Sequence, residues 1–211
     1  MSRPLRLKEM TPARAAELLA QVHRLLLPAG TLEVRGPHLP IGCDTIILDR
    51  LTDDLSAASG IPRAPIIDFG VHAAGERDKP GTAAFSRKTL HRAVNELIAG
   101  WEECAGVRDT LILTAHAADP HLEALSTIRT IGRVRVVDIL ALPSLLPLRE
   151  VRQGAWHGGE VDTSLMLFVA PDLVDAARIP PLVPASAEKG ARFYQAIMDT
   201  LMAHLAEFVK S

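Results

Sequence analysis

Two hydrophobic patterns alternate along this chain. Apolar residues at helical spacing mark residues of about 11–22, 44–59, 87–105, 119–131 and 186–209. Between these segments stand short, nearly all-apolar runs with the composition of buried strands, namely HRLLLPAG, APIIDFG, DTLILTAH and VRVVDIL. Such alternation is typical of βα units around a parallel sheet. We therefore predict an α/β fold of three layers, a mostly parallel sheet flanked by helices.

Length and composition indicate one compact unit. The chain has 211 residues, of which 48% are hydrophobic and 23% charged. This composition can bury a sizeable core, and the length stays below the point at which cores usually split. We predict a single domain over residues 1–211.

The charge distribution narrows the class of partner. The net charge is −2, and lysine and arginine are scattered along the chain. A nucleic-acid binder would gather them into a stripe, so we expect small, neutral or weakly charged substrates and no nucleic acid. The N-terminal residues lack the apolar core of a signal peptide or a membrane span, which predicts a cytoplasmic protein that does not contact a membrane. Cys43 and Cys104 are expected to be reduced thiols.

Polar residues cluster just after the predicted strands, where ligands bind in open α/β sheets. The first cluster is GTLEVRGPHLPIGCDT, residues 30–45, the second is TAHAADPH around His116, and the third is WHGGEVDTSLM. Their carboxylates and imidazoles are ligand types for divalent metals. Taken singly, each cluster also has a structural interpretation. Asp44 would begin a helix, His116 would be a hydrogen-bonded structural histidine, and Asp162 would cap a helix.

Together the clusters resemble, in order and spacing, the motifs of the creatininase family. The family patterns are E-x-H-G-x-H-L-P-x-x-x-D, then N-G-H-G-G-N after a strand, then H-A-G-x-x-E/D-T-S. In this chain the first runs from Glu33 to Asp44 and the third from His157 to Ser164, and a family landmark between them is similar to Pro80-Gly81-Thr82. The resemblance covers about residues 25 to 170 and implies a creatininase-like fold.

The resemblance also implies a metal site. The family ligands fall on Glu33, Arg35, Asp44, His116 and Glu160. One metal position, formed by Glu33, Asp44 and His116, is complete, whereas the other contains Arg35, whose guanidinium has no lone pair to donate. We therefore expect one divalent ion per chain, zinc, manganese or iron, with Arg35 replacing the charge of the second ion and pairing with Asp44 and Glu160.

The implied chemistry is hydrolysis of a C–N bond in a small amide, cyclic amide or formamide, because a divalent metal activates water and polarises a carbonyl. Glu160 is expected to be a ligand or the general base, and His157 or His38 the acid that protonates the leaving nitrogen. We assign substrate contacts to Arg35, His72 and Trp156. Cys43 is expected to be a small buried hydrophobe, with a thiolate ligand or nucleophile as the alternative.

Other functions remain open at this point. The lost ligand and the altered second motif, where Thr114, Ala115, Ala117 and Ala118 flank His116, also suit a catalytically inactive relative that binds or assembles with a partner. A third possibility is a biosynthetic enzyme that forms an amide or isomerises its substrate. By resemblance we expect the chain to form a homo-oligomer.

Overall fold

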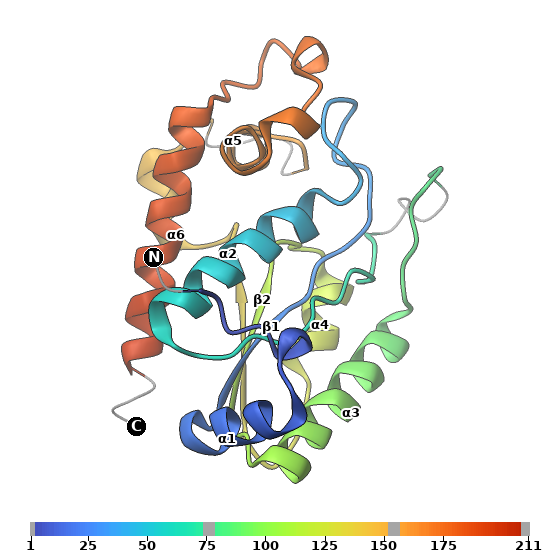
Figure 1. Cartoon of the computed structure of the whole chain (residues 1–211). Helices are drawn as coiled ribbons and strands as arrows, with labels where there is room; N and C mark the ends of the chain where they lie inside the picture. Colours follow the sequence, from blue (N-terminus) through green and yellow to red (C-terminus); the bar gives the residue numbers. More distant parts are fainter. Residues whose placement is uncertain (1–2, 74–78, 152–156, 208–211) are drawn as a thin grey trace.

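A three-stranded parallel sheet forms the centre of the molecule (Figure 1). The computed structural model describes residues 3–73, 79–151 and 157–207. The strands are β1 (Arg24–Pro28), β2 (Asp109–Thr114) and β3 (Arg133–Asp138), in the order β1-β2-β3. Leu26 of β1 lies opposite Leu111 of β2, which lies opposite Arg135 of β3. Three of the four predicted strands are thus confirmed.

The α-helices of the described residues, α5 apart, stand where the apolar spacing places them. They are α1 (Pro12–Val22), α2 (Cys43–Ser59), α3 (Arg87–Ala105), α4 (Asp119–Ser126), α5 (Glu160–Val169) and α6 (Ala187–Glu207), with short 3₁₀ turns at Leu7–Glu9, Pro143–Leu148, Pro171–Leu173 and Ala176–Arg178. Helix α4 ends earlier than residue 131. The amide of Arg129 donates to Asn95 Oδ1 at 3.1 Å, and the amides of Ile131 and Gly132 donate to the buried Glu102 carboxylate at 3.0 and 2.9 Å. These side chains compete with continuation of the helix.

Strand residues alternate between two cores. Leu26, Leu111 and Leu113 join a cluster with apolar residues of α2, α5 and α6. Their neighbours Leu25, Leu27 and Ile112 face the opposite way and pack with residues of α1, α3 and α4. Figure 1 shows these two groups of helices on either side of the sheet. The predicted three-layer α/β architecture is therefore confirmed.

The prediction of a regular strand over APIIDFG, residues 64–70, is wrong. The segment runs beside β1 and makes isolated parallel bridges, between Leu26 and Arg63 and between Ala29 and Ile67. Pro65 lies between these bridges and has no N–H to donate to a neighbouring strand. The segment lies beside the sheet but is only partly buried, with Phe69 42% exposed, and the proline keeps it from forming a continuous strand.

None of the helices in the described part of the chain is both long and apolar enough to cross a membrane.

Candidate functional site

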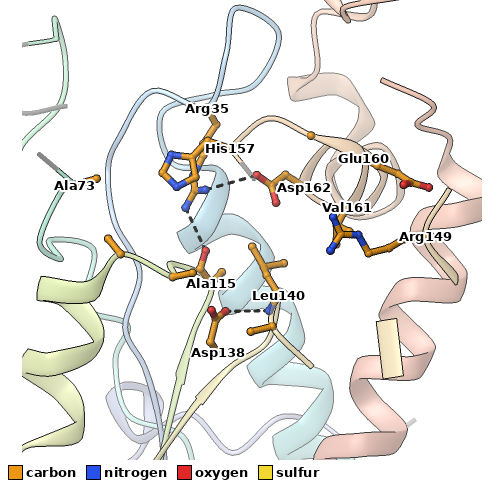
Figure 2. A pocket seen from close by; sticks show the side chains of 14 residues that line it. Arg35, Ala73, Ala115, Asp138, Leu140, Arg149, His157, Glu160, Val161 and Asp162 are labelled. Carbon is orange, nitrogen blue, oxygen red and sulfur yellow. Dashed lines mark hydrogen bonds and ion pairs between the residues drawn. The ribbon is translucent and has the colours of Figure 1, made fainter. Parts of the chain in front are cut away.

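Several of the predicted site residues converge above the carboxyl ends of β1 and β2. Glu33 and Arg35 lie in the loop that follows β1, and Asp44 stands in the first turn of α2. His116 follows β2 by two residues, and Asp162 lies in the first turn of α5. Figure 2 shows Arg35, His157 and Asp162 facing one another at the wall of a pocket. Parallel strands bring these loops to one edge of the sheet, as expected.

Arg35 occupies the centre of this group. The residue is 1% exposed. Its Nη2 atom lies 2.5 Å from Asp44 Oδ2, 3.0 Å from Glu33 Oε1 and 3.2 Å from His116 Nδ1. Its Nη1 atom lies 3.6 Å from Asp162 Oδ2. The guanidinium therefore stands among the three side chains that the resemblance assigned to a complete metal position.

Hydrogen bonding orients the ring of His116. Its Nε2 atom lies 3.0 Å from the carbonyl oxygen of Val71, which can only accept, so Nε2 donates to it. The Nδ1 atom points into the site and lies 3.1 Å from Glu33 Oε1. A backbone carbonyl behind an imidazole is the usual support of a metal-binding histidine.

One group of ligand atoms remains suited to a divalent ion. Glu33, His116 and His157 each offer a ligand atom, and these atoms lie within 4.8 Å of one another. Glu33 Oε1 is 3.1 Å from His116 Nδ1 and 3.5 Å from His157 Nδ1. Metal–ligand bonds of about 2.1 Å put neighbouring ligands roughly 3.0–3.4 Å apart. These separations fit a single ion.

The remaining carboxylates argue against a second ion. Asp44 Oδ2 already accepts from Arg35 Nη2 and, at 2.6 Å, from the Thr31 hydroxyl. By contrast, Glu33 Oε1 contacts Arg35 only as an ion pair at 3.0 Å, and neither Glu33 oxygen, both of them buried, has a hydrogen-bond partner among the described residues. Glu33 thus has coordination capacity to spare, whereas Asp44 is committed to the guanidinium.

A pocket of about 350 Å³ opens beside Arg35. Its walls are formed largely by small or apolar side chains, including Ala73, Ala115, Ala117, Ala118, Leu140, Ala141 and Val161. Polar groups enter it from Arg35, Asp138, Arg149, His157, Glu160 and Asp162. Its size and lining suit a compact molecule with few polar groups.

Burial and charge set the ionisation of the site. Burial raises the pKa of Glu33, but the neighbouring His116 ring and the charge of Arg35 outweigh it, so the net shift is downward. Burial raises the pKa of Asp162 to about 6, against the opposing charge of Arg35. Burial and Arg35 together lower the pKa of His157. The site therefore holds an ionised Glu33 and a neutral His157 at neutral pH.

A family comparison agrees with the motifs and the fold. The family model described as "Creatininase: Creatinine amidohydrolase" matches residues 8–196. The chain belongs to the creatininase family. It is also similar in structure to crystalline creatinine amidohydrolase, with a TM-score of 0.83, 22% identity and 98% of each chain covered. Similar creatininase structures include forms described as "Zn-Zn type" and "Creatininase Mn".

Curated relatives in this family have different named activities. The chain is 27% identical over 110 residues, 52% of its length, to 3-dehydro-scyllo-inosose hydrolase of Thermotoga maritima, and 26% identical over 163 residues, 74% of its length, to the mycofactocin precursor peptide peptidase of Mycolicibacterium smegmatis. These matches span 35% and 62% of the two relatives. Creatinine amidohydrolase of Pseudomonas putida is 27% identical over 185 residues, 77% of this chain and 70% of that protein.

In the third creatininase motif, Asp162 and not Glu160 faces the guanidinium. Glu160 accepts the backbone amides of Glu150, at 3.0 Å to both oxygens, and of Val151, at 2.9 Å. Lys189 Nζ donates to the same carboxylate at 2.9 Å. The structure therefore brings Glu33, Asp44 and His116 together and leaves Glu160, the fourth predicted ligand, engaged with other groups. The predicted pairing of Arg35 with Asp44 is present, whereas its other close carboxylates are Glu33 and Asp162.

Of the histidines predicted as acids or substrate contacts, His157 lines the pocket, whereas His38 and His72 are buried outside its lining. His157 lines the pocket, but His38 is 2% exposed, and its Nε2 atom lies 2.8 Å from the Thr163 hydroxyl. His72 is also buried, and its Nε2 atom lies 2.8 Å from the Leu32 carbonyl oxygen, to which it donates. Trp156 lies outside the described residues. His38 and His72 thus contact the loop and helix that carry the site.

Cys43 is fully buried, and burial raises the pKa of its thiol. It packs in the hydrophobic cluster with α2, as the simpler interpretation of the sequence predicts. Asp138 and Arg149 line the pocket but were not singled out from the sequence. Asp138 ends the strand VRVVD. Because ligands bind at the carboxyl ends of parallel strands, the same reasoning that selected His116 could have selected Asp138. Arg149 follows a 3₁₀ turn and carries no comparable signal.

Proposed function

We propose that this chain is a hydrolase of a C–N bond in a small amide, working with one divalent ion held by Glu33, His116 and His157. Arg35 serves as a permanent second cation. The observation that carries the proposal is the convergence of these three ligand atoms beside a buried guanidinium at the wall of a pocket. Membership of a family of hydrolases supports the reaction class.

The balance of charge supports a bound cation. Glu33, Asp44 and Asp162 face a single guanidinium and are all 2% exposed or less. Buried carboxylates in excess of their cationic partners are costly unless further positive charge neutralises them. A divalent ion between Glu33 and the two histidines would supply that charge without displacing Arg35.

Each residue then has a distinct task. A divalent ion at this position would supply a Lewis acid that activates water and polarises the amide carbonyl. Arg35 holds Asp44 and Asp162 in place and keeps a positive charge at the rear of the pocket. Asp162 lines the pocket, and a carboxyl whose pKa is about 6 suits proton transfer near neutral pH. We assign to Asp162 the transfer of a proton to the leaving nitrogen.

A second candidate function is a binding or assembly role without catalysis. The observation in its favour is that Arg35 Nη2 takes a position among Glu33, Asp44 and His116, at 2.5–3.2 Å from all three. In that case the guanidinium replaces metal altogether, and the site is a closed ion-pair network that stabilises the fold.

Thermal unfolding with and without Zn²⁺, Mn²⁺ or Fe²⁺ distinguishes the two functions. A ligand that binds only the native state stabilises it by about 2.7 kcal/mol at a hundred times its dissociation constant. We expect one of these metals to raise the melting temperature of the wild type but not of His116→Ala or His157→Ala. His204→Ala, on the distant part of α6, is the matched control and should respond like the wild type.

Hydrolysis of small cyclic amides by the metal-loaded protein, monitored by NMR, tests the reaction itself. Turnover that disappears in His157→Ala supports the proposal. A wild-type melting temperature that no metal changes would contradict it and favour the binding role.

A further inference from the structure

Asp138 is a carboxylate of the pocket that the proposed chemistry leaves unused. It ends β3, and its Oδ1 atom accepts the amide of Leu140 at 3.0 Å. Its Oδ2 atom is buried and has no hydrogen-bond partner within the described ranges of the chain. Figure 2 shows the carboxyl group between Ala115 and Leu140, among the residues that line the pocket. A buried carboxylate oxygen without a donor is costly, so a donor from the ligand would stabilise it.

The surroundings of Asp138 limit what that donor belongs to. The neighbouring lining residues Ala115, Leu140 and Ala141 are apolar and have no side-chain group to hydrogen-bond a ligand. The lining holds two cations elsewhere, Arg149 and Arg35, of which Arg35 is already engaged with three carboxylates. At Asp138 itself a carboxylate would repel an anion, whereas an N–H group at one end of a compact molecule would satisfy its free oxygen.

We propose that Asp138 is a specificity-determining residue whose Oδ2 atom accepts an N–H of the substrate, so that the pocket selects compact amides with a free N–H over their N-alkylated counterparts. This rests on the proposed function, since it takes the pocket as the substrate site. The role of Asp138 is in binding and needs neither a metal ion nor turnover.

Asparagine at this position provides a sharp test. In Asp138→Asn the side-chain oxygen can keep the Leu140 amide, and the new NH₂ group then faces the pocket. The acceptor becomes a donor of nearly the same shape. Asp172→Asn is the matched control, because Asp172 is exposed in the Pro171–Leu173 turn and does not line this pocket.

The probes are 2-pyrrolidinone, which has the N–H, and N-methyl-2-pyrrolidinone, which lacks it. Their dissociation constants are measured by saturation-transfer NMR on the full chain at pH 8. A hydrogen bond to a charged acceptor predicts that the wild type and Asp172→Asn bind the first lactam about tenfold more tightly. Asp138→Asn should lose or reverse this preference while its melting temperature confirms that it is folded.

Several results would overturn the inference. They are equal affinity of the wild type for the two lactams, no binding of either, or a preference that survives in Asp138→Asn. If Asp138→Asn does not fold, equal affinity of the wild type for the two lactams would still refute the proposed role of Asp138. Metal-dependent melting is a separate measurement. If metal raises the melting temperature but the two lactams bind equally, only the role of Asp138 is refuted. If the lactams are distinguished but no metal changes the melting temperature, only the metal assignment is refuted.

Discussion

At the scale of single residues, Arg35 decides how many ions the site can hold. Its Nη2 atom is within 3.2 Å of Glu33, Asp44 and His116, so these ligand atoms already share a cation. An imidazole at this position would remove the fixed charge and offer a lone pair.

We predict that Arg35→His binds one more equivalent of Zn²⁺ or Mn²⁺ than the wild type. Metal analysis of the dialysed proteins measures this. Arg35→Lys is the control, because it keeps a positive charge and should retain the wild-type content. Equal metal content in the wild type and Arg35→His would show that Arg35 does not limit the site.

Asp162 gives the site a dependence on pH. Its pKa is about 6 in the folded protein, above the ordinary value of 3.8 for an aspartate in an unfolded chain. Between these pH values the folded state holds a proton that the unfolded state has lost, so the free energy of unfolding falls as pH rises from about 4 to 6 and this contribution is constant above that range.

The side chain of Asp162→Asn does not titrate, so the free energy of unfolding of this variant should not fall between about pH 4 and 6 through this residue. The shift corresponds to on the order of 1–3 kcal/mol, so the variant should be more stable than the wild type above pH 6 and lose that advantage towards pH 4. Urea unfolding of metal-free protein across this range checks it. A difference between the two proteins that does not change with pH would contradict the assignment.

The sequence predicted most of these residues but not their arrangement. Strand ends and motif spacing were enough to select Glu33, Asp44 and His116. They did not show that the guanidinium of Arg35 lies between these ligands, because that depends on how far the side chain reaches across the loop. The spacing also could not decide between Glu160 and Asp162, which are two positions apart at the start of one helix.

At the scale of elements, the loop before α5 and the loop after β1 fit together through a glycine. Gly158 has φ of 68°, in the left-handed region. A Cβ atom there would lie 2.4 Å from the carbonyl oxygen of Arg35. The close approach holds the backbone of Arg35 against the start of α5.

Gly158→Ala should therefore destabilise the fold by about 1–3 kcal/mol and also weaken metal binding. Gly60→Ala is a suitable control, because Gly60 has φ of 72° but nothing within 4 Å of its Cβ position. Thermal and urea unfolding should show a larger decrease in the free energy of unfolding for Gly158→Ala than for Gly60→Ala. Equal losses would mean that the contact with Arg35 contributes nothing.

Glu160 and Lys189 join α5 to α6 and to the chain after the Pro143–Leu148 turn. Lys189 Nζ lies 2.9 Å from Glu160 Oε1 and 2.7 Å from Glu150 Oε1. The backbone amides and Lys189 lower the pKa of Glu160 against the opposing effect of burial, so the carboxylate is ionised at neutral pH.

We expect Glu160→Gln to lower the free energy of unfolding by about 1–3 kcal/mol while leaving metal affinity within a few-fold of wild type. Titration calorimetry with Mn²⁺ and urea unfolding measure the two effects. Loss of metal binding with unchanged stability would restore Glu160 as a ligand, as the sequence first suggested.

At the scale of the whole molecule, hydrophobic pattern predicted the layers and the order of the elements. Leucine-rich strands with residues facing both cores require helices on both sides of the sheet, and α1 to α6 supply them. The pattern failed over residues 64–70, where Pro65 has no N–H for pairing, and beyond Ser126, where Asn95 and Glu102 accept backbone amides of residues 129–132. The second failure depends on side chains that are distant in sequence. Self-association stays a prediction, which light scattering on the purified chain would test.

The proposed chemistry requires one ion lying beside an undisplaced Arg35. The most direct measurement is a crystal structure of the protein grown with Mn²⁺, with anomalous data collected at the manganese edge. We predict one anomalous peak per chain, bounded by Glu33, His116 and His157, with the Arg35 guanidinium still in contact with Asp44. Two peaks per chain, or one peak between Glu33, Asp44 and His116 with Arg35 turned away, would contradict it.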